Sequence, residues 1–184
     1  MRPPRPEGWL AEDLDNLPGA PSNTELIDGA LVLRMFPQRH WHSRVIHALH
    51  NTLDSQVPDE IEVSSKMTVR LDKYNRTEPD VIASTVSIAR DATWYEAKDV
   101  VLAIEVVSPE SKHRDTAVKP RKYAEAGIGH FWRVEDGDGT ASTAIHVYEL
   151  DDLTRTYVPI GIFRDTLEVD LPFPIELDVQ RLYG

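Results

Sequence analysis

VVLAIEVVSPESKHRDTAVKPRKYAEAGIGHFWRV, residues 100–134, is the stretch of sequence that decides the fold. Its first part, Val100–Val107, is almost entirely β-branched or apolar, which is typical of a strand buried on both faces. Residues 111–126 follow as a predicted helix that ends at Gly127. A second apolar run, residues 128–134, comes directly after the helix. A strand, a helix and a strand with short connections form a βαβ unit, so the sequence predicts an α/β protein with a partly parallel sheet.

Glu105 is the single charge in the first of these strands. Burying an ionised carboxylate without a partner costs several kcal/mol, so Glu105 must be neutral, paired with a cation, or bound to a metal. The predicted topology places it near the carboxyl end of a central strand. Asp115 and Lys119 stand four residues apart on the following helix, and therefore on one face of it.

Asp80 is a second acid at the start of a short apolar run, one predicted strand before Glu105. Two acids on adjacent central strands can bind a divalent cation at their tips. With a nearby lysine to orient or deprotonate water, for which Lys119 is the candidate, they are the groups needed to cleave a phosphodiester. Two alternatives stay open at this level. Asp80 can be a turn residue after Pro79, and the three side chains can form a buried ion pair.

Composition bounds the class of protein. The chain has 184 residues, of which 41% are hydrophobic and 28% charged, as expected for one globular domain. It has no cysteine, so disulfides and thiolate zinc sites are excluded, and oxygen ligands favour magnesium or manganese. No apolar run approaches the roughly 18 residues of a membrane span, and no signal peptide is evident, so we expect a cytoplasmic protein without a membrane partner. The net charge of −11 argues against a non-specific nucleic-acid coat protein but allows a nuclease with local basic residues.

Two segments before residue 60 carry further candidates. Residues 24–27 and 30–33 flank Asp28-Gly29, which predicts a β-hairpin with a type I′ turn. Glu25 begins the first of these strands and either faces solvent or belongs to a site. Residues 39–55 predict a helix with one apolar stripe. Beside that stripe runs a basic edge made of Arg39, His40, Arg44 and His47.

The basic edge has two interpretations, a surface that faces phosphate or a solvated helix face. A zinc site at His40 and His42 is disfavoured, because residues two apart on a helix point in different directions. No third ligand for such a site is evident.

The remaining segments are mostly extended. Residues 61–71 alternate as a strand with one buried face and an irregularity near Ser64-Ser65. Residues 85–98 form a connection without an assigned role. Residues 144–150 and 156–160 predict a second hairpin, and residues 164–177 finish the chain as a sheet extension or dimer surface.

Four stretches of the chain resemble the Uma-type restriction endonucleases, a family of unknown function within the PD-(D/E)XK nuclease superfamily. They are TELIDGAL (24–31), PQRH (37–40), EPDVI (78–82) and IEVVSPESKHRDTAVKPRKYAEAGIGHFW (104–132). The resemblance implies a restriction-endonuclease-like α/β core with a mixed central β-sheet flanked by helices, an N-terminal hairpin and C-terminal strand extensions. It covers residues 23–184 and leaves residues 1–22 as an N-terminal extension.

The resemblance also implies a set of site residues. Asp80 matches the motif aspartate and Glu105 the motif acid, and both would ligate the metal. Two residues after Glu105, where most members of the superfamily carry lysine, this chain has Val107. Lys119 matches the lysine that the Uma-type family supplies from the following helix. Lys122 is the second choice.

Glu25 and His40 also fall on motif positions of the family, which implies that they are accessory site residues.

Two functions compete on these grounds. The first is an endonuclease that hydrolyses DNA phosphodiester bonds with Mg²⁺ or Mn²⁺. The second is a catalytically inactive homodimer of the same fold that binds other molecules. The charge distribution favours contact with DNA, because residues 34–44 and 112–122 are basic, whereas acids concentrate in residues 7–15 and 135–178.

Overall fold

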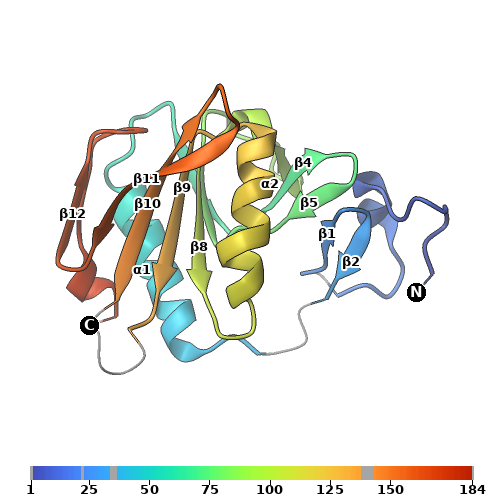
Figure 1. Ribbon diagram of the computed structural model, residues 1–184, viewed down its shortest axis with the longest axis horizontal. Helices are drawn as coiled ribbons and strands as arrows, with labels where there is room; N and C mark the ends of the chain where they lie inside the picture. Colours follow the sequence, from blue (N-terminus) through green and yellow to red (C-terminus); the bar gives the residue numbers. More distant parts are fainter. Residues whose placement is uncertain (1, 22, 34–36, 138–142, 184) are drawn as a thin grey trace.

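The computed structural model describes residues 2–21, 23–33, 37–137 and 143–183. In this part of the chain the strands form a six-stranded sheet, a five-stranded sheet and a two-stranded hairpin. Helices α1 (His40–Asp54) and α2 (Lys119–Ala126) lie on opposite faces of the six-stranded sheet (Figure 1). Arg34, the first residue of the predicted basic segment 34–44, lies outside the described residues, and so does the boundary predicted at residue 22.

The six-stranded sheet is mixed and runs in the order β11-β10-β9-β8-β6-β3. Its strands are β3 (Glu62–Ser65), β6 (Val81–Ser84), β8 (Val100–Val107), β9 (His130–Glu135), β10 (Ala144–Asp151) and β11 (Thr156–Phe163). Strands β8 and β9 pair in parallel, and the other neighbours are antiparallel. The predicted βαβ unit and the mixed α/β class are therefore confirmed, as is the hairpin β10–β11.

Each face of this sheet has its own hydrophobic core. On one face, Val45 and Leu49 of α1 pack against Ile104 of β8. On the other face, Tyr123 of α2 packs against Ala103 of β8 and Phe131 of β9. Side chains alternate along a strand, so Glu105 shares a face with Ala103 and points toward α2.

The helix after β8 contains one widened turn. Residues Arg114–Val118 form a π-helical turn that leads directly into α2, and α2 ends at Gly127. Gly127 has φ +87°, the left-handed conformation that glycine adopts most readily at the end of a helix. The predicted helix is therefore present and ends where expected, but its wide turn was not predicted.

The five-stranded sheet runs in the order β2-β1-β5-β4-β7. Its strands are β1 (Glu25–Ile27), β2 (Ala30–Val32), β4 (Thr68–Asp72), β5 (Asn75–Thr77) and β7 (Trp94–Glu96). Between β1 and β2, Asp28 and Gly29 both have positive φ, 50° and 74°, as a type I′ turn requires. The predicted N-terminal hairpin is confirmed, whereas β7 lies in a connection to which no strand was assigned.

Two of the places where the chain passes between these two sheets lie next to each other. The chain crosses from β3 to β4 at Lys66, and from β5 to β6 through residues 78–80. The amide of Lys66 donates a hydrogen bond to the carbonyl of Asp80 at 3.2 Å, which joins the two crossings. The prediction of a single strand over residues 61–71 is wrong, because Lys66 adopts a left-handed backbone with φ +58° and turns the chain into the second sheet.

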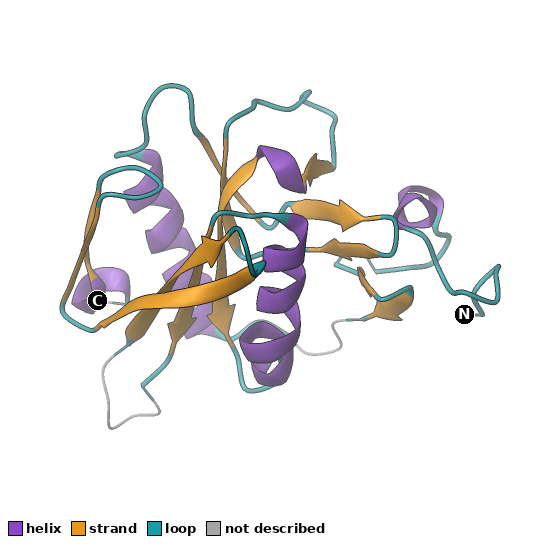
Figure 2. Ribbon diagram, turned by 45° about the horizontal axis from the view of Figure 1, so that its top comes forward, coloured by secondary structure: helices purple, strands orange, loops and turns teal. Residues whose placement is uncertain are grey.

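The two ends of the chain lie at opposite ends of the molecule (Figure 2). Near the N-terminus lies the 3₁₀ helix η1 (Ala11–Asn16), whose Asp15 pairs with Arg76 of β5. Two further short helices are η2 (Ala97–Asp99) and η4 (Val179–Leu182), and the C-terminal hairpin is made of β12 (Thr166–Val169) and β13 (Ile175–Asp178). Within the described ranges, no helix combines the length and the apolarity that a bilayer crossing demands.

Candidate active site

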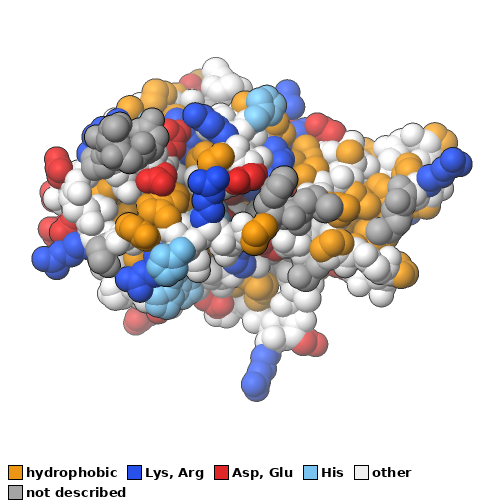
Figure 3. All heavy atoms as spheres, turned by 90° about the horizontal axis from the view of Figure 1, so that it is seen from below, with side chains coloured by type: hydrophobic (Ala, Val, Ile, Leu, Met, Phe, Trp, Pro, Cys, Tyr) orange, Lys and Arg blue, Asp and Glu red, His pale blue; other side chains and the backbone are white. Residues whose placement is uncertain are grey.

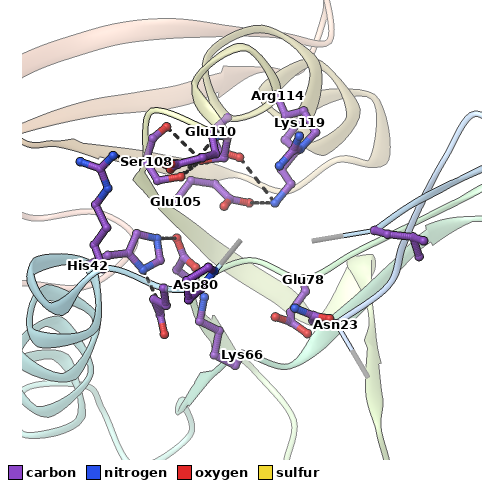
Figure 4. Close-up of a pocket in the computed structure, with 16 residues that line it drawn as sticks. Asn23, His42, Lys66, Glu78, Asp80, Glu105, Ser108, Glu110, Arg114 and Lys119 are labelled. Carbon is purple, nitrogen blue, oxygen red and sulfur yellow. Dashed lines mark hydrogen bonds and ion pairs between the residues drawn. The ribbon is translucent and has the colours of Figure 1, made fainter. Parts of the chain in front are cut away.

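A cavity of about 480 Å³ opens where β8 ends and the π-helical turn begins (Figure 4). Five carboxylates line it, together with four basic side chains and one histidine. These ten residues are Glu78, Asp80, Glu105, Glu110, Asp115, Arg39, Lys66, Arg114, Lys119 and His42. The cavity therefore gathers residues from the crossings between the sheets, from β8, and from both helical segments.

Glu105 lies at the floor of this cavity and is 1% exposed. Its Oε1 accepts hydrogen bonds from Lys119 Nζ at 3.0 Å and from Tyr123 Oη at 2.5 Å. Burial raises the pKa of Glu105 to about 8, and the acids around it add to the rise, although the positive charge of Lys119 opposes it. Glu105 is therefore a carboxyl group that holds its proton more tightly than usual, even with the Lys119 ammonium group beside it.

Lys119 is surrounded by carboxylates and is itself 1% exposed. Its Nζ lies 2.8 Å from Glu25 Oε1 and 3.6 Å from Asp115 Oδ1, in addition to its contact with Glu105. The π-helical turn contains Asp115 and directs both it and Lys119 toward the sheet. An exposed i, i+4 pair between these two residues is thereby excluded, because Asp115 is only 2% exposed.

Asp80 occupies the crossing between β5 and β6 and carries an ionised carboxylate. Its Oδ2 accepts the amide of Val106 at 2.7 Å and lies 3.4 Å from His42 Nε2, and its Oδ1 contacts Lys66 Nζ. Burial alone would raise the pKa of Asp80, but the hydrogen bond from His42 and the charge of Lys66 outweigh it and lower the pKa. The pKa of Asp80 is therefore lowered, while that of the neighbouring Glu105 is raised. Opposite pKa shifts in a pair of acids often mark a functional site.

Comparison with protein families identifies the chain. The family model Uma2, described as "Putative restriction endonuclease", matches residues 11–180. The chain belongs to the Uma2 family. This finding confirms the resemblance seen in its sequence motifs.

A solved structure has the same fold as this Uma2 protein. It is the crystal structure of "a putative nuclease belonging to DUF820" from Anabaena variabilis ATCC 29413, with a TM-score of 0.72 and 16% sequence identity. The match covers 94% of this chain and 96% of that one. No curated protein matches the chain. At this identity the likeness establishes the fold alone.

The fold of the Uma2 protein brings four of the predicted site residues together. Asp80, Glu105 and Lys119 line one cavity, and Glu25 contacts Lys119 from the first strand of the hairpin. Glu25 is fully buried, so the interpretation of this residue as solvent-facing is wrong. Its Oε1 also accepts the amide of Glu78 at 2.8 Å.

Two other candidates lie elsewhere. His40 is exposed, its ring packs edge-on against Tyr183 with 6.2 Å between centroids, and it does not line the cavity. Lys122 pairs with Asp28 at the hairpin turn and does not line the cavity. The histidine that contacts Asp80 is His42 instead.

Sequence reasoning missed several residues of the site. His42 could have been found, since it lies three residues before Val45 on the buried stripe of α1, whereas His40 is off that stripe. Tyr123 follows Lys119 by four residues and shares its face in the same way. Lys66 was not recognised as a site residue: the sequence indicates an irregularity near Ser64-Ser65, directly before it, but not a crossing between two sheets.

The donor set suits a hard divalent cation. Within the described residues no three acids, histidines or cysteines are arranged to hold a metal ion. Mg²⁺ does not require such a cage, since it commonly binds one or two carboxylates and completes its shell with water and substrate phosphate. The buried Oδ1 of Asp115 accepts no hydrogen bond within the described part of the chain, which adds an oxygen with spare capacity near Glu105.

The surface around the cavity mouth is mixed in charge. Figure 3, which views the molecule from the side toward which β8 points, shows lysine, arginine and histidine side chains interspersed with acids. Arg39 and Glu110 pair there at 3.2 Å. Any nucleic acid would therefore be held by local contacts rather than by one broad basic patch.

Proposed function

We propose that this Uma2 protein is a divalent-metal-dependent endonuclease that hydrolyses phosphodiester bonds of DNA. Asp80 and Glu105 are the metal ligands, Mg²⁺ or Mn²⁺ is the cofactor, and Lys119 is the catalytic lysine. The observation that carries the proposal is the meeting of these three side chains in one cavity, with Lys119 Nζ 3.0 Å from Glu105 Oε1. The three residues are far apart in the sequence and come from two strands and a helix. Their meeting in one cavity is therefore not well explained by chance.

The two carboxylates have different tasks in this proposal. Asp80 stays ionised, because His42 and Lys66 lower its pKa, and it offers a fixed negative oxygen. Glu105 has a raised pKa and loses its proton when a cation arrives. When bound, the divalent cation supplies polarisation of the scissile phosphate and a lowered pKa for water.

Lys119 acts as a fixed positive charge and hydrogen-bond donor. Held by Glu25 and Asp115, its Nζ points at Glu105, next to the place where water and the scissile phosphate would meet. There it orients the water and stabilises the negative charge that develops on the phosphate. Glu25 is a positioning residue, and His42 takes the accessory role that the family motif suggested for His40.

The test is cleavage of supercoiled plasmid DNA with added Mg²⁺ or Mn²⁺, comparing the wild type with Asp80→Ala and with the isosteric Asp80→Asn. We expect nicked and linear products from the wild type only, and none in the presence of a chelator. A folded wild-type protein that leaves plasmid DNA intact with either metal would refute the proposal and favour a non-catalytic binding protein. RNA of the same sequence, assayed in parallel, decides whether DNA is the preferred substrate.

The proposal extends to a homodimer located in the cytoplasm. Light scattering coupled to size-exclusion chromatography tests the dimer, and cell fractionation tests the location.

A further inference from the structure

A second cavity, of about 440 Å³, lies beside the first along helix α1. Its lining is made of Gln38, Ser43, Ile46, His47, His50, Asn51, Ser65 and Lys66. Gln38 and Lys66 line both cavities, so the two spaces adjoin at these side chains. These two side chains therefore form the boundary between the two cavities.

The two cavities have opposite electrostatic character. Five acids line the first, whereas none of the eight residues that line the second is acidic. The second cavity offers an ammonium group, two imidazoles, two hydroxyls and two amides. All of these groups can donate hydrogen bonds.

These donors are held in place yet reachable from solvent. The His50 ring contacts Ser65 Oγ at 2.9 Å through Nδ1, and the His47 ring contacts the Asn51 amide at 3.0 Å through Nε2. His47, Asn51 and Ser43 are exposed on α1. In a chain with net charge −11, a cavity without acids is the kind of place where an anion can bind.

We propose that this second cavity binds a phosphate group of the nucleic-acid strand, next to the phosphate that lies in the active-site cavity. Lys66, His47 and His50 are its principal ligands. The proposal rests on the function proposed above. It adds the path of the nucleic-acid strand, which leads from the active-site cavity along α1.

Lys66 explains why a continuous strand fits better than a free anion. Its Nζ contacts Asp80 in the first cavity, yet about a third of its side chain is exposed and lines the second cavity. The ammonium group of Lys66 thus lies between the two cavities. In that position one positive charge can contact two successive phosphates of the same strand. Phosphate contacts of this kind position a strand without reading its sequence.

The experiment measures binding of a fluorescent oligodeoxynucleotide in a chelator, so that no cleavage takes place. Ser43→Glu places an acid at the exposed rim of the second cavity and leaves Asp80, Glu105 and Lys119 untouched. Its matched control is Ser87→Glu, which makes the same charge change at an exposed position outside both cavities. We expect Ser43→Glu to weaken binding about tenfold or more, because like charges placed together in an interface are strongly unfavourable, while Ser87→Glu binds like the wild type.

A second variant tests the ligands directly. His47→Ala with His50→Ala should reduce affinity, because two hydrogen-bond donors to the phosphate are lost, whereas Lys73→Met, a charge removed at an exposed turn, should leave it unchanged. Equal affinity of Ser43→Glu, of the double histidine variant and of the wild type would overturn the proposal. If inorganic phosphate binds in the cavity while the oligonucleotide binds equally to all variants, the site takes a free anion and the strand assignment is wrong.

These outcomes are independent of cleavage. A protein that fails to cut plasmid DNA with Mg²⁺ or Mn²⁺ refutes the proposed activity, yet loss of oligonucleotide binding in Ser43→Glu alone would still support the second cavity as a strand-binding site.

Discussion

Lys119 and Glu105 form a buried contact at the active-site cavity, with Nζ 3.0 Å from Oε1 and each side chain 1% exposed. The lysine comes from the helix and the acid from the central strand, fourteen residues earlier. A surface ion pair can be removed with little effect, but the buried cation of Lys119 cannot, because it also contacts Glu25 and Asp115 and these acids would lose their cation.

Lys119→Met should therefore abolish cleavage while metal binding survives. The metal ligands remain and only the group that orients water and stabilises charge is lost, so we expect a rate loss of roughly 10²- to 10³-fold. Loss of the buried cation should also lower the free energy of unfolding by about 3 kcal/mol. Circular dichroism at the assay temperature confirms that the variant is folded.

Lys122→Met is the matched control, on the same helix and paired with Asp28 rather than with Glu105. If Lys122→Met destroyed a measurable activity that Lys119→Met retained, the assignment of the catalytic lysine would be reversed.

Glu105→Gln should weaken binding of a divalent cation and leave the metal-free fold at least as stable. Between pH 4.5 and about 8 the folded protein keeps a proton on Glu105 that the unfolded chain releases, so this residue lowers the free energy of unfolding as pH rises. Glutamine does not titrate, so the variant does not lose this stability. Its free energy of unfolding should exceed that of the wild type by an amount that grows across this pH range to about 1–3 kcal/mol. Urea unfolding at pH 5 and pH 8 measures the difference in the free energy of unfolding. Calorimetric titration measures the affinity for the divalent cation. Unchanged metal affinity would show that Glu105 is not a ligand.

Tyr123→Phe should reduce metal affinity without touching a ligand. The phenol donates a hydrogen bond to Glu105 Oε1 at 2.5 Å, which favours the ionised carboxylate and fixes its orientation. Loss of such a supporting contact typically costs at least about tenfold in metal affinity. Tyr95→Phe is a suitable control, since Tyr95 is equally buried but its hydroxyl contacts Ser64. Equal losses in both variants would indicate general loosening of the core.

His42→Ala should reduce cleavage more than His40→Ala does. His42 Nε2 lies 3.4 Å from Asp80 Oδ2 and helps to keep that carboxylate ionised, whereas His40 packs on Tyr183 at the surface. Single-turnover cleavage rates separate the two. A larger loss in His40→Ala would restore the assignment made from the family motif.

Much of this site could be predicted because local patterns specify the elements that carry it. The apolar run around Glu105 marks a buried strand, and the spacing of the next helix, ended by Gly127, places Lys119 on the face that returns to the sheet. Asp28-Gly29 fixes the hairpin turn, and with it the position of Glu25. In each case the deciding interactions lie within a few residues of one another.

The remaining features depend on contacts between distant segments. Residues 61–71 read as one strand, because the alternation of apolar side chains continues through the crossing at Lys66. Which sheet each half joins is decided by β5 and β6, and not by the residues themselves. The pairing of Lys66 with Asp80 follows from that choice, so no local pattern could reveal it.

The widened turn at Arg114–Val118 makes the site sensitive to the length of the chain as well as to its composition. A π-helical turn holds one residue more than an α-helical turn. Removing a residue there would let the helix close normally, while rotating Asp115 by about 100° relative to Lys119. A related chain that aligns with a one-residue gap in this turn would keep the fold and the motif lysine but lose their mutual geometry. Alignment gaps at this turn, rather than substitutions, would then separate family members with an assembled site from those without one.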